Sequence, residues 1–340
     1  MPRRSKWLAN IGPDDPVELA AARALDARLS LVWHYLPRAA QSPEDPENVH
    51  QLRVSTRRAM AAMNLFASLL PAVRAEWMTK ALKRIRRAAN DARDCDVLLD
   101  RLEVLAEQEP EGHYGLLVKC VAARRRQAQP AIVAAHAKLV RRDYPRRLAA
   151  LLKRVWLRES VDLAERPTFA AAGRRSLDPL VEAFFAASEA NLHVDVDHQA
   201  AALHAFRIQA KQVRYAMEIF SAAFAPSFRR ELYPLVEQLQ EKLGAVNDHV
   251  TAIAHLEDWL GSEENPTARA AIGELVEHEQ RDLAERRQTF FDWWTAERRL
   301  ELRVRFGHAL THSDPHDHAV PAADAVPTAD ELPTTERNAG

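Results

Sequence analysis

Three features are scarce in this 340-residue chain, and each scarcity excludes a class of protein. The two cysteines, Cys95 and Cys120, have neither the number nor the spacing of a disulfide framework or a zinc site. Only nine glycines are present, whereas Ala, Leu, Arg and Glu, which favour helices, are abundant. No stretch approaches the roughly 18 consecutive apolar residues that a membrane span requires. We therefore predict an all-α protein in a reducing compartment, without a membrane span.

The N-terminus has only part of the pattern of an export signal. Residues 1–7 are basic, as such a signal begins, but Asn10, Asp14 and Asp15 follow where its apolar core should stand. We therefore expect a cytoplasmic location.

Charge is distributed unevenly, although the net charge is only −1. Between His50 and Arg158, 23 lysines and arginines stand against 10 acidic residues. The segment 311–340 has the opposite character, because it carries six acidic residues and one arginine and has no helical periodicity. We expect a basic body that binds a polyanion, followed by a disordered acidic tail.

The sequence contains an internal repeat with an offset of 154 residues. His50 to Phe66 aligns with His204 to Phe220, and without a gap the same offset places Arg93-Asp94 on Asn247-Asp248. The repeat predicts an N-terminal extension (1–16), a domain (17–310) with two helical halves (about 17–165 and 170–310) related by a pseudo-two-fold axis, and the tail (311–340).

Each His-led helix of the repeat has an apolar side and a cationic side. At 100° per residue, His50, Arg53 and Arg57 fall within an arc of about 60° that contains no acidic residue. The second helix repeats the pattern with His204, Arg207, Lys211 and Arg214. A row of like charges repels itself unless an anion lies over it. A further basic face, predicted next to the first helix, comprises Lys80, Lys83, Arg84 and Arg87.

These motifs resemble the CHAD (conserved histidine α-helical domain) family. The resemblance rests on HxxRVxxRR at 50–58, HxxRIxxKxxRYxxE at 204–218, and the Arg93-Asp94 and Asn247-Asp248 elements, and it extends over about residues 20–310. It implies two four-helix bundles around a central basic cavity. It also implies inorganic polyphosphate as the ligand, association with polyphosphate granules, and no catalytic activity or cofactor.

The ligand contacts that the resemblance implies come from both His-led helices and from the adjacent basic helix. They are His50, Arg53, Arg57, Arg58, Lys80, Lys83, Arg84, Arg87, His204, Arg207, Lys211, Arg214 and Tyr215. Gln212 stands at the position equivalent to Arg58, so that contact is expected only in the first half. Guanidinium groups suit this ligand because their forked donors match phosphate oxygens.

Two other functions draw on the same residues. A metal-dependent phosphohydrolase could use Asp91, Asp94, Asp96 and Asp100, but the sequence has no HExxH pair and no phosphate-binding glycine loop. We interpret Asp94 and Asp248 as residues at helix starts or turns, and we predict no metal site. A nucleic-acid-binding protein would use the same cations, but Tyr215 is the only aromatic residue among them for base stacking. We therefore do not expect a nucleic acid partner.

Overall fold

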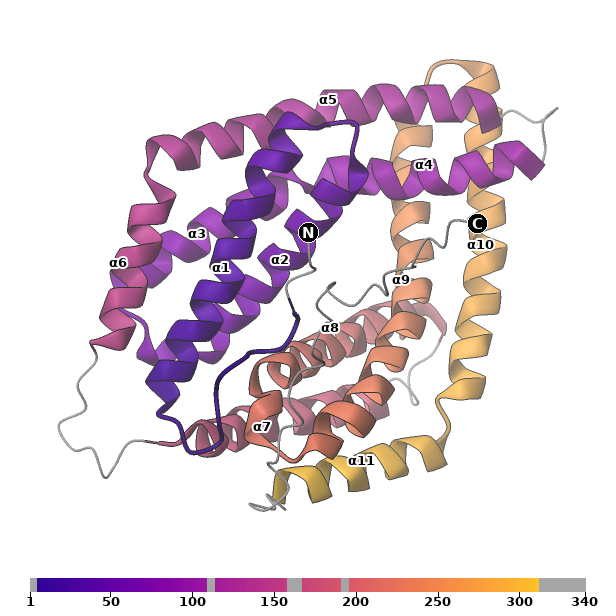
Figure 1. Ribbon diagram of the computed structural model, residues 1–340. Helices are drawn as coiled ribbons and strands as arrows, with labels where there is room; N and C mark the ends of the chain where they lie inside the picture. The colour runs from indigo at the N-terminus through magenta and orange to yellow at the C-terminus, as the bar shows by residue number, and fades with distance from the viewer. Residues whose placement is uncertain (1–4, 109–113, 158–166, 191–195, 312–340) are drawn as a thin grey trace, which may run out of the picture.

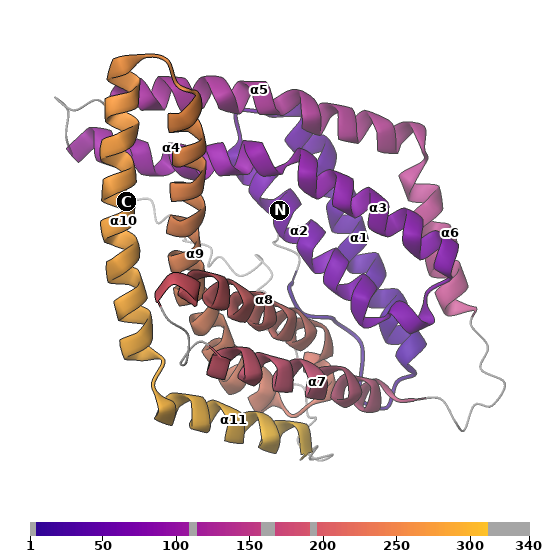
Figure 2. The ribbon, with the colours of Figure 1, turned by 180° about the vertical axis from the view of Figure 1, so that it is seen from behind.

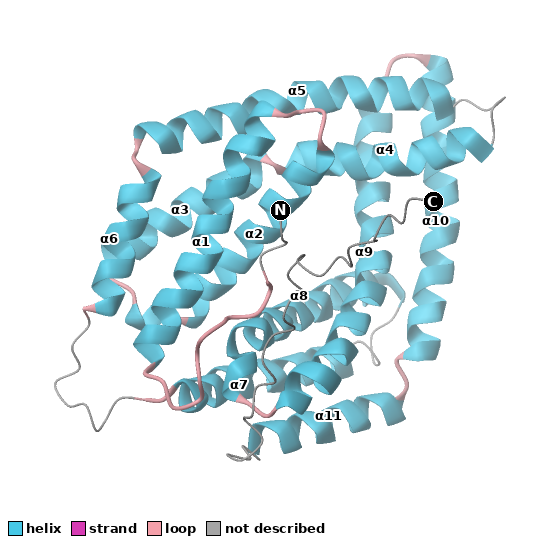
Figure 3. Ribbon diagram, in the orientation of Figure 1, coloured by secondary structure: helices cyan, strands magenta, loops and turns pink. Residues whose placement is uncertain are grey.

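The computed structural model describes residues 5–108, 114–157, 167–190 and 196–311, and the long elements in these ranges are all helices (Figures 1 and 3). The first half contains α1 (Val17–Gln41), α2 (Pro46–Leu65), α3 (Ala72–Ala88), α4 (Asn90–Gln108), α5 (Tyr114–Arg141) and α6 (Tyr144–Trp156). The second half contains α7 (Phe169–Ala190), α8 (Val196–Phe220), α9 (Tyr233–Ser262), α10 (Pro266–Trp293) and α11 (Ala296–Thr311). The predicted all-α class is confirmed.

The repeat in the sequence is also a repeat of helices. Shifted by 154 residues, α1, α2, α5 and α6 coincide with α7, α8, α10 and α11 to within five residues at each end. The remaining elements differ, because α3 and α4 together correspond to the single helix α9. The chain changes direction at Ala89, between α3 and α4, whereas α9 continues without a break (Figure 2). The two-fold relation between the halves remains a prediction.

The helices form two groups that share one hydrophobic core. The helices α1, α2, α3 and α6 pack together, and α7, α8, α11 and the first part of α9 form the second group. A continuous cluster of buried side chains extends through both groups, from Ile11 to Leu310. As Figure 1 shows, α4 and α5 extend away from the first group to the far ends of α9 and α10.

A second, separate cluster lies where these four long helices meet. It contains Leu102 of α4, Leu117 of α5, Leu256 of α9 and Leu275 of α10, all with no exposed surface. The two halves are therefore joined at two places, and α4 and α9 span the distance between them.

A proline and a glycine lie inside helices, although both residues disfavour helix interiors. The helix α1 continues through Pro37 to Gln41. Gly173 lies inside α7, and a Cβ added to it would stand 3.2 Å from the ring of Phe220 and 3.3 Å from the ring of Phe224. Glycine is needed there because the helices approach closely, a reason that hydrophobic periodicity does not reveal.

The N-terminal extension is largely described by the structure, whereas the acidic tail is not. The acidic tail lies outside the described residues except for Thr311. Of the N-terminal extension, residues 5–16 pack on the body: Ile11 is buried, and Trp7 makes an edge-on contact with Tyr233. None of the described helices has the length and apolar character needed to cross a membrane.

Candidate anion-binding site

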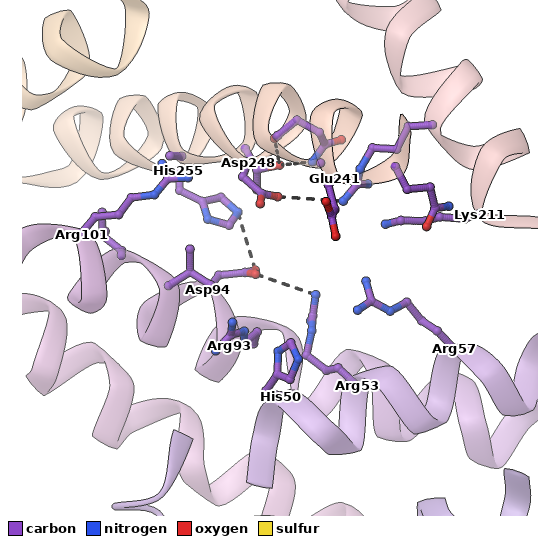
Figure 4. Close-up of a pocket in the computed structure, with 18 of the residues that line it drawn as sticks. His50, Arg53, Arg57, Arg93, Asp94, Arg101, Lys211, Glu241, Asp248 and His255 are labelled. Atoms are coloured by element: carbon purple, nitrogen blue, oxygen red, sulfur yellow. Dashed lines mark hydrogen bonds and ion pairs between the residues drawn. The ribbon is translucent and has the colours of Figure 1, made fainter. Parts of the chain in front are cut away.

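Four helices, two from each half, enclose a cavity of about 470 Å³ (Figure 4). They are the repeat-related helices α2 and α8 and the long helices α4 and α9. Asp45 caps α2 by accepting a hydrogen bond from the Glu47 N–H, and Pro46 occupies its first position. The apolar stripe of α2, including Leu52, Ala59 and Met63, is buried, so the opposite cationic side faces the cavity.

Positive side chains outnumber carboxylates around this cavity. The seven lysines and arginines are Arg53, Arg57, Arg93, Arg101, Arg207, Lys211 and Arg214. They face four carboxylates, those of Asp94, Glu237, Glu241 and Asp248, together with the imidazoles of His50 and His255. With Lys211 protonated, the cavity has an excess of three positive charges before either histidine is protonated.

An arginine–aspartate pair recurs at equivalent positions in the two halves. Arg53 Nη2 lies 4.0 Å from Asp94 Oδ1, and Arg207 Nη2 lies 3.9 Å from Asp248 Oδ1. Asp94 also lies 4.0 Å from the Nε2 atom of His255 (Figure 4). The interpretation of both aspartates as helix-start or turn residues is wrong, because Asp94 follows the first turn of α4 and Asp248 lies in the middle of α9.

Three of the cavity cations have no carboxylate within 4.0 Å among the described residues: Arg57, Arg93 and Lys211. The Nε atom of Arg57 is buried and has no hydrogen-bond partner there. Buried polar groups are normally hydrogen-bonded, because an unsatisfied group costs about 1–3 kcal/mol. Arg57 is therefore available to an anion that enters the cavity.

The electrostatic field of the cavity disfavours further positive charge. Burial, reinforced by Arg93, lowers the pKa of His50 below its usual value. Burial, with Arg207 and Arg57 nearby, lowers the pKa of Lys211 to about 7. Both groups will take up protons more readily when an anion compensates the arginines.

Of the predicted site residues, seven line this cavity. They are His50, Arg53, Arg57, Arg207, Lys211, Arg214 and Tyr215. Arg214 lies 3.6 Å from Glu237 and 5.3 Å from the ring of Tyr215, which holds its guanidinium on the α9 side of the cavity. The structure thus brings together cations of α2 and α8 that are 150 or more residues apart in the chain.

Arg58 and His204 are placed elsewhere. The Arg58 guanidinium donates two hydrogen bonds, of 2.7 and 2.9 Å, to the fully buried carboxylate of Glu218. Arg58 therefore joins the two halves instead of lining the cavity. The Nδ1 atom of His204 lies 3.0 Å from Asn247 Oδ1, and His204 lines a second cavity of about 320 Å³. Because Asn247 borders both cavities, His204 lies immediately behind the wall of the first.

The predicted basic face of α3 does not line the cavity. Its buried stripe, Met78, Ala81, Leu82 and Ile85, packs against the first bundle, so the opposite side faces solvent. The exposed residues there are Lys80, Lys83, Arg84 and Arg87. Their repeat partners include Glu237 and Glu241, which do line the cavity because α9 continues as one helix where the first half is broken at Ala89.

Sequence reasoning missed the contribution of α4 and the second part of α9. Arg93, Arg101 and His255 line the cavity, and Arg101 and His255 occupy equivalent positions of the repeat. The spacing of Arg93, Val97 and Arg101, four residues apart, places them on one face of α4 and could have predicted that this face is cationic. Among the described residues, no group of three or more potential metal ligands comes together.

Comparison with known proteins agrees with this fold. Two uncharacterised proteins from strains of Mycobacterium tuberculosis are 27% identical to this chain over 300 residues, 86% of its length. The chain spans about half the length of these relatives, 54%. The crystal structure of the CHAD domain from the plant Ricinus communis is similar with a TM-score of 0.64 and 23% identity, covering 84% of this chain and 92% of that domain.

A second solved structure, PptA from Streptomyces chartreusis, matches with a TM-score of 0.56 and 20% identity, over 82% of this chain and 99% of that one. The CHAD domain family model itself matches residues 23–257, which include α2, α4, α8 and α9 as far as residue 257, and all the residues that line the cavity. The resemblance that the two His-led helices indicated is thereby confirmed, and this chain belongs to the CHAD domain family.

Proposed function

We propose that this chain binds inorganic polyphosphate in the cavity between α2, α4, α8 and α9, and does not cleave it. The observation that supports this function is the convergence of seven lysines and arginines from both halves on one space. Three of them, Arg57, Arg93 and Lys211, have no carboxylate within 4.0 Å among the described residues. A single phosphate cannot contact cations on all four helices, whereas a chain of phosphates can.

The arrangement supports binding by charge and by hydrogen-bond geometry. Each guanidinium offers a planar fork of donors that fits two phosphate oxygens, and the Arg57 Nε–H has no hydrogen-bond partner among the described residues. Arg53 and Arg207 lie 4.0 and 3.9 Å from their aspartates, beyond hydrogen-bond distance, so each can turn toward a ligand without losing a hydrogen bond to that partner.

The proposal is tested by titration with polyphosphates of graded length at several salt concentrations. Affinity should rise with chain length until the cavity is spanned, and should fall steeply with salt, because each phosphate contact releases a counterion. Arg57→Glu should weaken binding by at least about tenfold, since it replaces an attraction in the cavity by a repulsion. A salt slope near zero would contradict binding through several phosphate contacts.

The matched control is Arg87→Glu, which makes the same change of charge on the exposed side of α3. It should change affinity by less than about twofold at physiological salt, because exposed charges are screened over about 8 Å. Equal losses from both variants would mean that polyphosphate binds over the surface of the basic half and not in the cavity. Circular dichroism of each variant establishes that the helices are retained.

Two assays separate this function from its rivals. Incubation with polyphosphate and Mg²⁺ should release no inorganic phosphate and leave the chain-length distribution unchanged. Release at a rate that depends on Asp94 would favour the phosphohydrolase. Duplex DNA should fail to displace polyphosphate at equal phosphate concentration, and displacement would favour nucleic-acid binding. Localisation of the fluorescently tagged chain to polyphosphate granules, abolished by Arg57→Glu, would extend the proposal to the cell.

A further inference from the structure

Among the described residues, Lys211 of α8 is the only lysine that lines the cavity. It has neither a hydrogen bond nor an ion pair among the described residues. From α2 it is faced by Arg57, from its own helix by Arg207 and Arg214, and from α9 by Asp248 and Glu241, which also line the cavity (Figure 4). The Asp248 carboxylate lies 3.9 Å from Arg207, and among the described residues neither Asp248 nor Glu241 comes within 4.0 Å of the Lys211 amine. The arginines therefore dominate the surroundings of this amine.

These surroundings give the amine an unusual reactivity. Burial and the positive charges of Arg207 and Arg57 lower the pKa of Lys211 to about 7. A substantial fraction of the Lys211 amines is then neutral at pH 7, whereas a solvated lysine, with a pKa of about 10.4, is neutral in roughly one molecule in a few thousand. Only the neutral amine is a nucleophile, so the cavity activates this side chain.

The same arginines attract phosphate groups to the amine. Among the described residues the Nε–H of Arg57 has no hydrogen-bond partner, and guanidinium groups bind phosphate oxygens through paired donors. A small molecule that carries a phosphate next to an electrophilic carbon would be held with that carbon close to Lys211. We propose that Lys211 is a covalent modification site that is acylated by small acyl phosphates.

The reaction needs no redox partner and no group other than the acyl phosphate. The Lys211 nitrogen attacks the carbonyl carbon, a nitrogen–carbon bond forms, and the bond from that carbon to the bridging oxygen breaks. Phosphate leaves with the electron pair of the broken bond, and the nitrogen loses its proton to the departing phosphate or to water. The products are an amide on Lys211 and inorganic phosphate.

Acylation would also regulate the cavity. It converts a group that can be cationic into a neutral amide and fills part of the 470 Å³. Polyphosphate affinity should therefore fall after modification. This regulatory consequence rests on the proposed function, but the acylation itself does not, because it needs only the amine and the arginines.

The test uses the whole chain and acetyl phosphate at pH 7, with acetylation of each lysine measured over time by peptide mass spectrometry. Lys83, on the exposed side of α3, is the internal reference. Lys211 should be acetylated at least about tenfold faster than Lys83, given its larger neutral fraction. Inorganic phosphate added to the wild-type chain should slow Lys211 selectively. Equal rates at the two lysines would overturn the proposal.

A second reagent separates phosphate binding from the reactivity of the amine. Acetic anhydride acetylates the same neutral amine but carries no phosphate, so the ratio of the two rate constants is independent of the lysine pKa. Arg57→Ala should lower this ratio at Lys211 at least about threefold and leave it unchanged at Lys83. An unchanged ratio at Lys211 would mean that the arginines do not guide the acyl phosphate, and would overturn the proposal.

Polyphosphate binding by the unmodified chain is measured separately, so the two proposals can fail independently. Selective acetylation without polyphosphate binding would leave Lys211 as a modification site in a cavity of another function. Polyphosphate binding with an unreactive Lys211 would leave the proposed function and overturn the inference.

Discussion

Glu218 makes polar contacts with residues of both halves. Its carboxylate has no exposed surface and accepts hydrogen bonds from Arg58 and from the Tyr233 hydroxyl. Arg28 of α1, which is itself buried, and Arg214 each lie 3.9 Å from it. One carboxylate therefore compensates guanidinium groups from α1, α2 and α8, next to the cavity.

Replacing Glu218 should destabilise the protein severely. In Glu218→Gln, buried arginines lose the charge that compensates them, which typically costs about 3–5 kcal/mol. Urea unfolding followed by circular dichroism measures the loss. Glu76→Gln is the control: its carboxylate is 64% exposed and pairs with Lys80 four residues away, so the change should stay within about 0.5 kcal/mol. Similar losses in the two variants would contradict the role assigned to Glu218.

Lys211 is expected to lower the stability of the folded protein, although it contributes to the proposed ligand site. The pKa of Lys211 is about 10.4 in the unfolded chain and about 7 in the folded one, so the unfolded chain binds the proton more readily. The free energy of unfolding therefore decreases as the pH drops from about 10 to 7, and this contribution does not change further below pH 7. Lys211→Met should therefore raise the free energy of unfolding at pH 7 by about 1 kcal/mol. The gain should shrink toward pH 10.

The measurement for Lys211→Met is urea unfolding without ligand at pH 7 and pH 10, with Lys83→Met as the matched control on the exposed side of α3. Only the cavity variant should show a pH-dependent gain. An equal gain at both pH values would indicate better packing by methionine instead of the removal of an unfavourable charge.

At the scale of helices, the sequence was informative where local patterns decide the structure. Capping by Asp45 and Pro46 and the apolar stripe of α2 define one helix, and the repeat offset predicted its partner α8. The direction of α3 could not be predicted, because periodicity gives the face of a helix but not its neighbours. The partner of Arg58 could not be predicted for the same reason. Arg58 lies on the expected helix, but the buried carboxylate that it binds belongs to Glu218, 160 residues away in the sequence.

Gly173 shows how close approach of helices constrains one position of α7. A Cβ there would lie 3.2 Å from Phe220 and 3.3 Å from Phe224, so Gly173→Ala should force the rings apart and cost about 1–3 kcal/mol. Gly273→Ala is the opposite case, because nothing lies within 4 Å of its added Cβ in α10. Alanine is the better helix former, so this variant should gain about 0.5–1 kcal/mol. Thermal unfolding of both variants tests the opposite signs.

At the scale of the whole molecule, the cavity lies between two separate apolar clusters. The large cluster extends through both bundles, and the distal cluster joins the far ends of α4, α5, α9 and α10. Because α4 and α9 carry cavity residues between these two places, the spacing of the cations depends on both clusters. A substitution in an apolar cluster should therefore change the spacing of the cavity cations without changing any charge.

Leu275→Ala tests this dependence. Leu275 of α10 is fully buried in the distal cluster and does not line the cavity, so the substitution should cost about 2–5 kcal/mol and loosen the support of α4 and α9. We expect polyphosphate affinity to fall several-fold at a temperature where the chain remains folded. Hydrogen exchange should increase first at the distal ends of these two helices.

Leu302→Ala is the matched control, because it makes the same truncation in α11, within the large cluster but outside the four helices of the cavity. It should lower stability comparably and leave polyphosphate affinity unchanged. If both truncations weaken binding equally, affinity follows global stability. If only Leu275→Ala weakens binding, the distal cluster sets the distance between the cations of the two halves. The cavity then requires both halves of the repeat, packed at both clusters, and neither half forms it alone.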